Sequence, residues 1–301
     1  MSTPTSSAGI TPGSDGSNRS DGPAPGAPRT VMAHMIPYYP TYDASVRVAQ
    51  ALIDGGAAYL EVQFPYSDPT ADGPAIQAAC AGALQQGFRV AQGWEFIRSI
   101  TGGTGAGQDD GAGQDDGAGQ DDGARQSAGP SQGAVPIFLM SYAGLVYAYG
   151  IQRFVQDAVA AGVSGLIVPD LPVDSDEGLF AAGREAGLHV VPVISMGAEE
   201  ARLRLVEEMG AAYIYASLRR GITGTHTEIG EENSAFVQRL TDSGARVLAG
   251  FGIATAEQVS AVLEHAHAAV VGSAFVRAIA EAPEDPYPTV RALAAELSGS
   301  G

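Results

Sequence analysis

Short hydrophobic runs alternate with longer amphipathic stretches along most of this chain. The runs are rich in Val, Ile, Ala and aromatic residues and show little polar alternation, which is typical of strands that are buried on both faces. This pattern predicts eight strands, at residues 34–39, 59–64, 136–142, 165–170, 189–195, 212–218, 247–251 and 268–272.

Amphipathic helices are predicted between the strands, and most of them end at a glycine, the usual helix C-cap. They cover residues 45–55, 151–162, 177–187, 199–210, 233–244 and 256–265. Alternating strands and helices indicate a parallel sheet covered by helices. Because there are eight strands and no G-x-G-x-x-G motif follows the first, we expect an α/β fold of the (β/α)8 TIM-barrel type, with its chemistry at the carboxyl ends of the strands.

Two segments lack the composition of a packed core. Residues 1–31 are rich in Gly, Ser, Pro and Thr, and residues from about 101 to 133 are mostly Gly, Asp, Gln, Ala and Ser, with the sequence GAGQDD repeated three times at 105–122. Such segments bury too little apolar surface to offset the entropy of ordering. We therefore expect one barrel domain at 32–299, preceded by a disordered leader and interrupted by a disordered acidic loop insertion.

Charge and cysteine content exclude several classes of protein. The formal net charge of −18 argues against a nucleic-acid partner. No apolar run approaches the roughly 20 residues of a membrane helix, and the amino terminus lacks the pattern of a secretory signal. The single cysteine, Cys80, cannot form an internal disulfide. These features predict a soluble, cytoplasmic protein without a membrane partner.

Two carboxylates stand out at the end of the second predicted strand. Glu61 lies inside an apolar strand, where a carboxylate is costly unless it is paired or protonated, so it is either half of a buried pair or functional. Asp72 follows in a loop dense in Asp, Pro and Gly, where it is either a helix cap or turn residue or part of a site. For Asp68, in the same loop, the turn interpretation is favoured.

The last three strands lead into loops of small residues. They run into GITG at 221–224, GFGI at 250–253 and GSA at 272–274, and the last two precede predicted helices. Backbone N–H groups of small residues and helix N-termini bind anions, and loops after strands seven and eight of such barrels often hold a phosphate. The pattern favours a phosphorylated substrate, the alternative being glycines that serve tight turns alone.

Two residue types limit the chemistry. The chain has no lysine, which excludes a Schiff-base aldolase. Its histidines are scattered in a way that does not predict a metal site, at positions His34, His189, His226, His265 and His267. We therefore expect neither a metal nor another cofactor, and carbon–carbon cleavage in this barrel would depend on general acid–base catalysis by carboxylates.

Taken together, the segments resemble the tryptophan synthase alpha family from about residue 32 to 297. The most specific of them is FPYSDPTADGPAIQ at 64–77, and the others are GLIVPDLP at 165–172 and the three small-residue loops. The resemblance implies a lyase that splits indole-3-glycerol phosphate into indole and glyceraldehyde 3-phosphate in tryptophan biosynthesis. It also implies a beta subunit as partner in an α2β2 complex.

The resemblance also implies individual roles. Glu61 matches the glutamate that protonates C3 of the indole ring and handles the proton of the glycerol hydroxyl. Asp72 matches the aspartate that accepts a hydrogen bond from the indole N–H. The remaining matches are substrate-binding positions at Tyr38, Met140, Tyr142, Tyr215, Thr223 and Phe251, and phosphate-binding positions at Gly224, Gly252, Gly272 and Ser273. Thr223 lies on the loop expected to close over the substrate.

The chain departs from the family pattern in three places: at Gly144, where the family often has asparagine, at Arg219 and Arg220, and in the opening segment MAHMIPYYPTYDAS. The first two departures leave coupling to a beta subunit open. Two other functions also remain open, namely an isomerase on a phosphate-binding barrel and a degenerate alpha subunit that only activates its partner.

Overall fold

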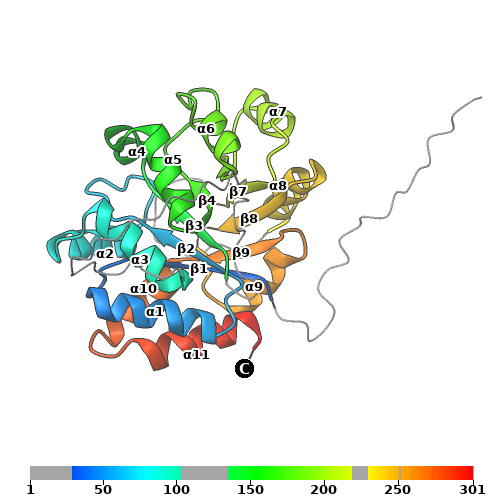
Figure 1. Cartoon of the computed structure of the whole chain (residues 1–301). Coiled ribbons are helices and arrows are strands. Elements are labelled where there is room, and N and C mark those ends of the chain that lie inside the picture. The colour runs from blue at the N-terminus through cyan, green and yellow to red at the C-terminus, as the bar shows by residue number, and fades with distance from the viewer. Residues whose placement is uncertain (1–28, 103–134, 219–229, 251, 301) are drawn as a thin grey trace, which may run out of the picture.

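The computed structural model describes residues 29–102, 135–218, 230–250 and 252–300 (Figure 1). Strands and helices alternate along these segments. Their bounds are β1 Val31–Met35, α1 Tyr42–Asp54, β2 Tyr59–Gln63, α2 Pro74–Gln85, α3 Val90–Thr101, β3 Ile137–Met140, α4 Ala143–Tyr149, α5 Ile151–Ala160, β4 Val163–Ile167, α6 Leu179–Ala186, β5 His189–Val191, β6 Val193–Ser195, α7 Glu200–Glu208, β7 Tyr213–Ser217, α8 Glu231–Asp242, β8 Arg246–Gly250, α9 Ala256–Leu263, β9 Ala268–Val271, α10 Ser273–Glu281 and α11 Tyr287–Ser298.

The strands of this part of the chain form one parallel sheet that closes on itself. Their order is β5-β4-β3-β2-β1-β9-β8-β7-β6. The two strands at the ends of this order are consecutive in the chain and are separated only by Pro192. β5 pairs with β4 and β6 pairs with β7, so one interrupted strand joins the two edges. The predicted (β/α)8 barrel is confirmed.

Pro192 explains why nine strands are found where eight were predicted. Proline has no backbone N–H and therefore cannot donate to a sheet ladder. Its carbonyl still accepts a hydrogen bond from the Tyr215 N–H at 2.9 Å. β5 and β6 together cover the predicted fifth strand at 189–195, which the proline divides at the point where its pairing changes from one neighbour to the other.

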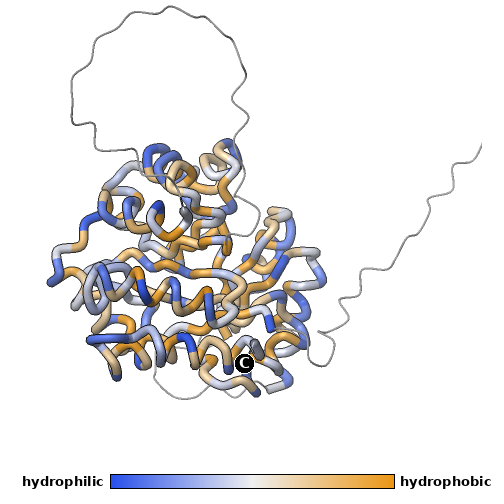
Figure 2. The backbone as a smooth tube through the Cα atoms, turned by 60° about the horizontal axis from the view of Figure 1, so that its bottom comes forward, coloured by the Kyte–Doolittle hydropathy of each residue, from blue (hydrophilic) through white to orange (hydrophobic). Residues whose placement is uncertain are grey.

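The residues inside and outside the barrel alternate along each strand, as the pleat requires. One buried cluster fills the interior, and it includes Met32, Phe138, Met140, Tyr215 and Leu248. A larger cluster fills the space between the sheet and the helices, and the hydrophobic parts of the tube lie mainly toward the middle of the molecule (Figure 2). The interior of such a barrel is filled by side chains, so a site is expected at the carboxyl ends of the strands.

The first strand differs from its prediction. It was expected at 34–39, but β1 ends at Met35. Tyr38 has a φ of +67°, in the left-handed region, and the Tyr39 N–H bonds back to the Ile36 carbonyl at 3.3 Å. A turn at these residues replaces the extended backbone that the run of apolar residues predicted.

The fold begins slightly before residue 32, because Val31 is already in β1 and the Arg29 N–H donates to the Ser298 carbonyl at 2.7 Å. The predictions for the leader up to residue 28 and for the insertion at 103–134 fall on residues outside the described part of the chain. No helix among the described residues is long and apolar enough to cross a membrane.

Candidate active site

Strand β2 carries both Glu61 and a second buried polar residue, Gln63. Tyr59 packs against the interior cluster, so by the two-residue period Glu61 and Gln63 also face the inside of the barrel. The loop from β2 to α2 then brings Asp72 back over the strand end, where its side chain is only 4% exposed. Both predicted carboxylates are therefore buried at the carboxyl end of the same strand.

Glu61 is paired with His34, which occupies the neighbouring position of β1 in the sheet register. The Nδ1 atom of His34 and Oε2 of Glu61 share a hydrogen bond of 2.8 Å, and both side chains are buried. Nε2 of His34 and Oε1 of Glu61 have no hydrogen-bond partner among the residues that the structure describes. The buried-pair alternative for Glu61 is thus met, and one oxygen of its carboxyl group is left over.

Asp72 is held by two hydrogen bonds to the same carboxylate oxygen. Gln63 Nε2 donates to Oδ2 at 2.6 Å, and the Tyr142 hydroxyl donates to it at 2.8 Å. Gln77 Nε2 donates to the Asp72 carbonyl at 2.8 Å. Helix α2 begins instead after Gly73, without a side-chain cap. The cap interpretation of Asp72 is therefore wrong, because its side chain points into the site network. Asp68, by contrast, is exposed in a turn.

Burial controls the acidity of the groups around Asp72. Desolvation raises the pKa of Asp72, while His34, Gln63 and Tyr142 act in the lowering direction. The pKa of Tyr142 is raised, first by burial and then by the Asp72 charge. The pKa of Tyr215 is raised well above its ordinary value by burial, with Glu61 and Asp72 adding to the effect. The two phenols are therefore protonated at neutral pH.

The position of Tyr142 depends on Tyr66 and Gly144. The rings of Tyr66 and Tyr142 stack with centroids 5.2 Å apart. A Cβ atom at residue 144 would lie 2.5 Å from the Tyr66 hydroxyl. Gly144, one of the departures from the family pattern, therefore leaves the space that the Tyr66 ring needs to cover Tyr142.

The other predicted substrate positions fall in two places. Met140 and Tyr215 belong to the interior cluster, on β3 and β7. A Cβ at Gly250 would lie 2.8 Å from the Tyr215 hydroxyl, so glycine there makes room for this ring. Tyr38 instead packs edge-on against Tyr42 and Phe88. Tyr38 is thus held in an aromatic cluster on the helix side of the sheet, whereas Met140 and Tyr215 lie inside the barrel.

The predicted phosphate positions differ in how their helices begin. β9 leads directly into α10, with Gly272 as N-cap and Ser273 as the first helical residue, and no side chain caps this end. Helix α9 is capped by Thr255, which accepts from Gln258 N–H in a capping box. Gly252 has a φ of +92°. Since uncapped N–H groups are the ones that bind anions, the α10 end fits the prediction best.

Three of the predicted residues cannot be placed, since Thr223, Gly224 and Phe251 lie outside the described residues, as do Arg219 and Arg220.

The sequence reasoning missed His34 and Gln63, the direct partners of the two carboxylates. His34 was weighed only as a metal ligand, and Gln63 was not considered. A signal was present, because Gln63 is two residues from Glu61 in an apolar strand and both must share a face. The partnership of His34 depended on the strand register, which the misplaced first strand concealed. Among the described residues, no group of three or more His, Cys, Asp or Glu side chains could hold a metal ion.

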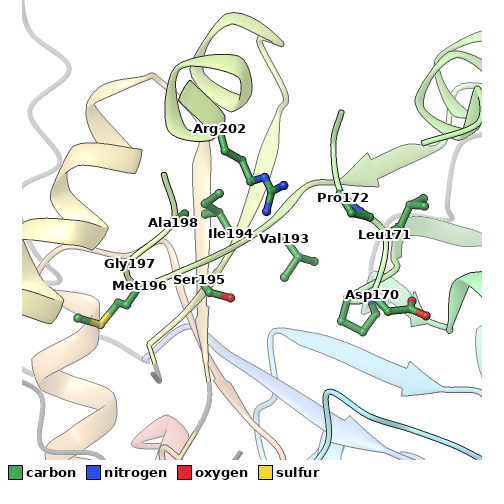
Figure 3. Close-up of a pocket in the computed structure, with 11 residues that line it drawn as sticks. Asp170, Leu171, Pro172, Val193, Ile194, Ser195, Met196, Gly197, Ala198 and Arg202 are labelled. Atoms are coloured by element: carbon green, nitrogen blue, oxygen red, sulfur yellow. The ribbon is translucent and has the colours of Figure 1, made fainter. Parts of the chain in front are cut away.

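A pocket of about 290 Å³ opens at the carboxyl ends of β4 and β6 (Figure 3). It is bordered by 169–172, part of the GLIVPDLP segment, and by 193–198, and Arg202 extends toward it from α7. Asp170 also accepts a hydrogen bond from the Ala143 N–H at 2.9 Å. None of the predicted site residues lines this pocket.

Comparison with known proteins agrees with this geometry. The family model of the tryptophan synthase alpha chain matches residues 29–105 and 126–299, so the gap contains most of the acidic repeat. The tryptophan synthase alpha chain of Helicobacter hepaticus is 32% identical over 277 residues, covering 89% of this chain and 95% of that protein. That of Leifsonia xyli is 34% identical, with 87% and 89% covered.

Solved structures give the same result. A chain of the tryptophan synthase α2β2 complex from Pyrococcus furiosus superposes with a TM-score of 0.74 and 26% identity, covering 91% of this chain and 99% of that one. A chain of Mycobacterium tuberculosis tryptophan synthase gives a TM-score of 0.73 at 27% identity, with 91% and 93% covered. With the sequence, the barrel and the paired carboxylates in agreement, the chain belongs to the tryptophan synthase alpha chain family.

Proposed function

We propose that this protein is a lyase that cleaves indole-3-glycerol phosphate to indole and glyceraldehyde 3-phosphate. The observation that carries the proposal is the pair of buried carboxylates, Glu61 and Asp72, that meet at the carboxyl end of β2 within a chain of this family. Each is held by its own hydrogen-bond partner, so the two can take different roles.

Glu61 supplies the proton transfers. Cleavage requires that C3 of the indole ring gain a proton and that the adjacent glycerol hydroxyl lose one, while the electron pair of the broken carbon–carbon bond returns to the ring. The Oε1 atom of Glu61 has no hydrogen-bond partner within the described part of the chain and is therefore available to donate and accept these protons. Burial excludes the water that would compete for the protonated ring.

Asp72 stabilises the positive charge of the reacting ring. Protonation at C3 moves positive charge to the indole nitrogen, and a carboxylate that accepts the N–H hydrogen bond offsets it. Gln63 and Tyr142 donate to the same oxygen of Asp72 and fix its orientation before substrate arrives. The site is therefore organised in advance for a cation.

The phosphate of the substrate binds at the start of α10. Gly272 and Ser273 present uncapped backbone N–H groups at the positive end of the helix dipole. Gly272 adjoins His34, since a Cβ there would lie 3.7 Å from the Cβ and Cγ atoms of His34. The phosphate end and the Glu61 end of the site are thus connected by one side chain.

A beta subunit is the partner that we propose, in an α2β2 complex like the one named for the relative from Pyrococcus furiosus. The compartment that we propose is the cytoplasm. A biosynthetic lyase that releases indole is best placed beside an enzyme that consumes it. Gly144, the departure that leaves coupling to this subunit open, is exposed on the first turn of α4 at the carboxyl end of the barrel.

The test is to incubate the purified full chain with indole-3-glycerol phosphate, with and without a beta subunit, and to follow indole release. We expect release by the wild-type chain and a loss in kcat of at least about 10²-fold in Glu61→Gln, which keeps the size of the side chain but not its transferable proton. The thermal midpoint should be preserved.

Two results would point to the alternatives. A chain that stimulates a beta subunit but releases no indole would be a degenerate activator, and a chain that binds a phosphorylated sugar but not indole-3-glycerol phosphate would be another barrel enzyme. Near-normal turnover in Glu61→Gln with a lowered thermal midpoint would assign Glu61 a purely structural role.

A further inference from the structure

The imidazole of His34 is the nearest titratable neighbour of Glu61. Strands β1 and β2 pair these two residues in register, and Nδ1 of His34 lies 2.8 Å from Oε2 of Glu61. The side chains are 1% and 2% exposed. A hydrogen bond this well buried fixes the carboxyl group in one orientation, with Oε1 as its free oxygen.

The position of His34 in the barrel ties it to the rest of the site. It follows Met32 by two residues and so faces the interior, beside Glu61 on one neighbouring strand and Gly272 at the end of the other. Its charge also acts on Asp72. The histidine therefore occupies the centre of the candidate site.

A histidine and a carboxyl group joined in this way can hold a proton on either side of their hydrogen bond. An imidazolium with a carboxylate and an imidazole with a carboxylic acid contain the same number of protons, so a proton that moves along the bond turns one into the other. Among the described residues, Nε2 of His34 has no hydrogen-bond partner, so none of them fixes the tautomer of the ring through that nitrogen.

We propose that His34 is a positioning residue for the lyase reaction, which orients the Glu61 carboxyl group and shares with it the proton that the reaction transfers. This inference rests on the proposed function. Glu61 gives its proton to C3 of the indole ring, and the proton of the glycerol hydroxyl returns to Glu61. The pair regains its original proton count after each turnover, and His34 itself needs no contact with the substrate.

Two other titratable groups lie near the pair among the described residues. They are Asp72, from the loop after β2, and Tyr215, from β7, while Gly272, which follows β9, adjoins His34. Without the imidazole, the transferable proton has only the carboxylate to occupy, so the dependence of kcat on pH changes when His34 is replaced.

The test is His34→Asn, whose amide stands where Nδ1 was but does not titrate. We expect KM to remain within about threefold and kcat to fall by roughly tenfold to a hundredfold, as for a misplaced acid–base group, with a changed pH profile of kcat. The matched control is His267→Gln. His267 lies before β9, at the other end of the barrel, where Nε2 bonds to the Tyr59 hydroxyl at 2.8 Å. The control should leave kcat and its pH profile unchanged.

A double-mutant cycle separates positioning from packing. If His34 acts through Glu61, adding His34→Asn to Glu61→Gln lowers kcat no further, whereas a packing defect would add to the loss. Histidine-selective ¹⁵N NMR of the full chain measures the ring nitrogens of His34 directly, so it tests the His34–Glu61 hydrogen bond without turnover and without a His34 variant. The His34 Nδ1 signal should change in Glu61→Gln, and the signals of the other histidines should not.

Each outcome decides a different claim. A wild-type kcat and pH profile in folded His34→Asn, or an unchanged NMR signal in Glu61→Gln, overturns the role of His34 and leaves the lyase assignment standing. A wild-type chain that releases no indole overturns the proposed function, and the role of His34 falls with it.

Discussion

The hydroxyl of Tyr142 offers a sharp test of the Asp72 network. It donates to Asp72 Oδ2 at 2.8 Å and accepts from the Ala71 N–H at 3.2 Å, so it joins the loop that carries Asp72 to the end of β3. Tyr142→Phe removes both bonds and keeps the ring that stacks on Tyr66. The change thus isolates one buried oxygen atom.

The magnitude follows from the two bonds that are lost. A hydrogen bond to a charged group contributes about 1.5–3 kcal/mol and one between neutral groups about 0.5–1.5 kcal/mol, so the free energy of unfolding should fall by roughly 2–4 kcal/mol. At about 2–4 °C per kcal/mol for a domain of this size, Tm should fall by roughly 4–16 °C. Among the described residues, Asp72 then keeps Gln63 as its side-chain donor at Oδ2.

The loss of stability in Tyr142→Phe should depend on pH. Burial raises the pKa of Asp72 in the fold, so the stability that this group contributes is present below its unfolded pKa of about 3.8 and is lost as the pH rises through the folded value. The Tyr142 bond lowers the folded pKa. Without it the pKa rises further, and the ionised form is disfavoured more. Tyr142→Phe should therefore be more destabilising at pH 8 than at pH 3, which lies below both pKa values.

Thermal unfolding followed by circular dichroism at both pH values measures this difference. Tyr287→Phe is the matched control, because its hydroxyl donates to Asp54 Oδ2 at 2.6 Å on the surface. Its effect should be close to zero at either pH, since water replaces an exposed bond. Equal losses of Tm at pH 3 and pH 8 in Tyr142→Phe would refute the reasoning, because they would mean that the hydroxyl does not donate to an ionised carboxylate.

Three further predictions concern other parts of the chain. Cys80 is fully buried and burial raises its pKa to about 12, so at pH 8 a thiol reagent should label the unfolded chain and leave the native chain unlabelled over the same time; rapid native labelling would contradict this. Deleting residues 104–123 should leave Tm and indole release nearly unchanged, because changing the length of a polar loop costs little, and a large drop in Tm would argue otherwise. Ser273→Asp should raise KM sharply by placing a negative charge at the uncapped start of α10, and Gly252→Asp should do the same; an unchanged KM in Ser273→Asp would place the phosphate elsewhere.

Much of the fold could be predicted because hydrophobic periodicity reports burial directly. The runs at 59–64 and 268–272 became β2 and β9 within one residue at either end. The first strand was predicted too late in the sequence because apolar residues continue past Met35, whereas the backbone turns at Tyr38. A run of apolar residues indicates burial, but it does not distinguish a strand from a buried turn that follows it.

By itself, the sequence determined that Glu61 and Asp72 stand at the end of a buried strand and that small residues follow the last strands, because strand periodicity and loop composition are local properties. Only the tertiary structure decided their partners. His34 and Glu61 are 27 residues apart in the sequence and are brought together by the register of their two strands, and Tyr142 bonds to Asp72, from which it is 70 residues away in the sequence. The same holds for the helix ends, where Thr255 caps α9 while α10 stays uncapped. Contacts between distant residues depend on how the barrel closes, and closure involves all the strands at once.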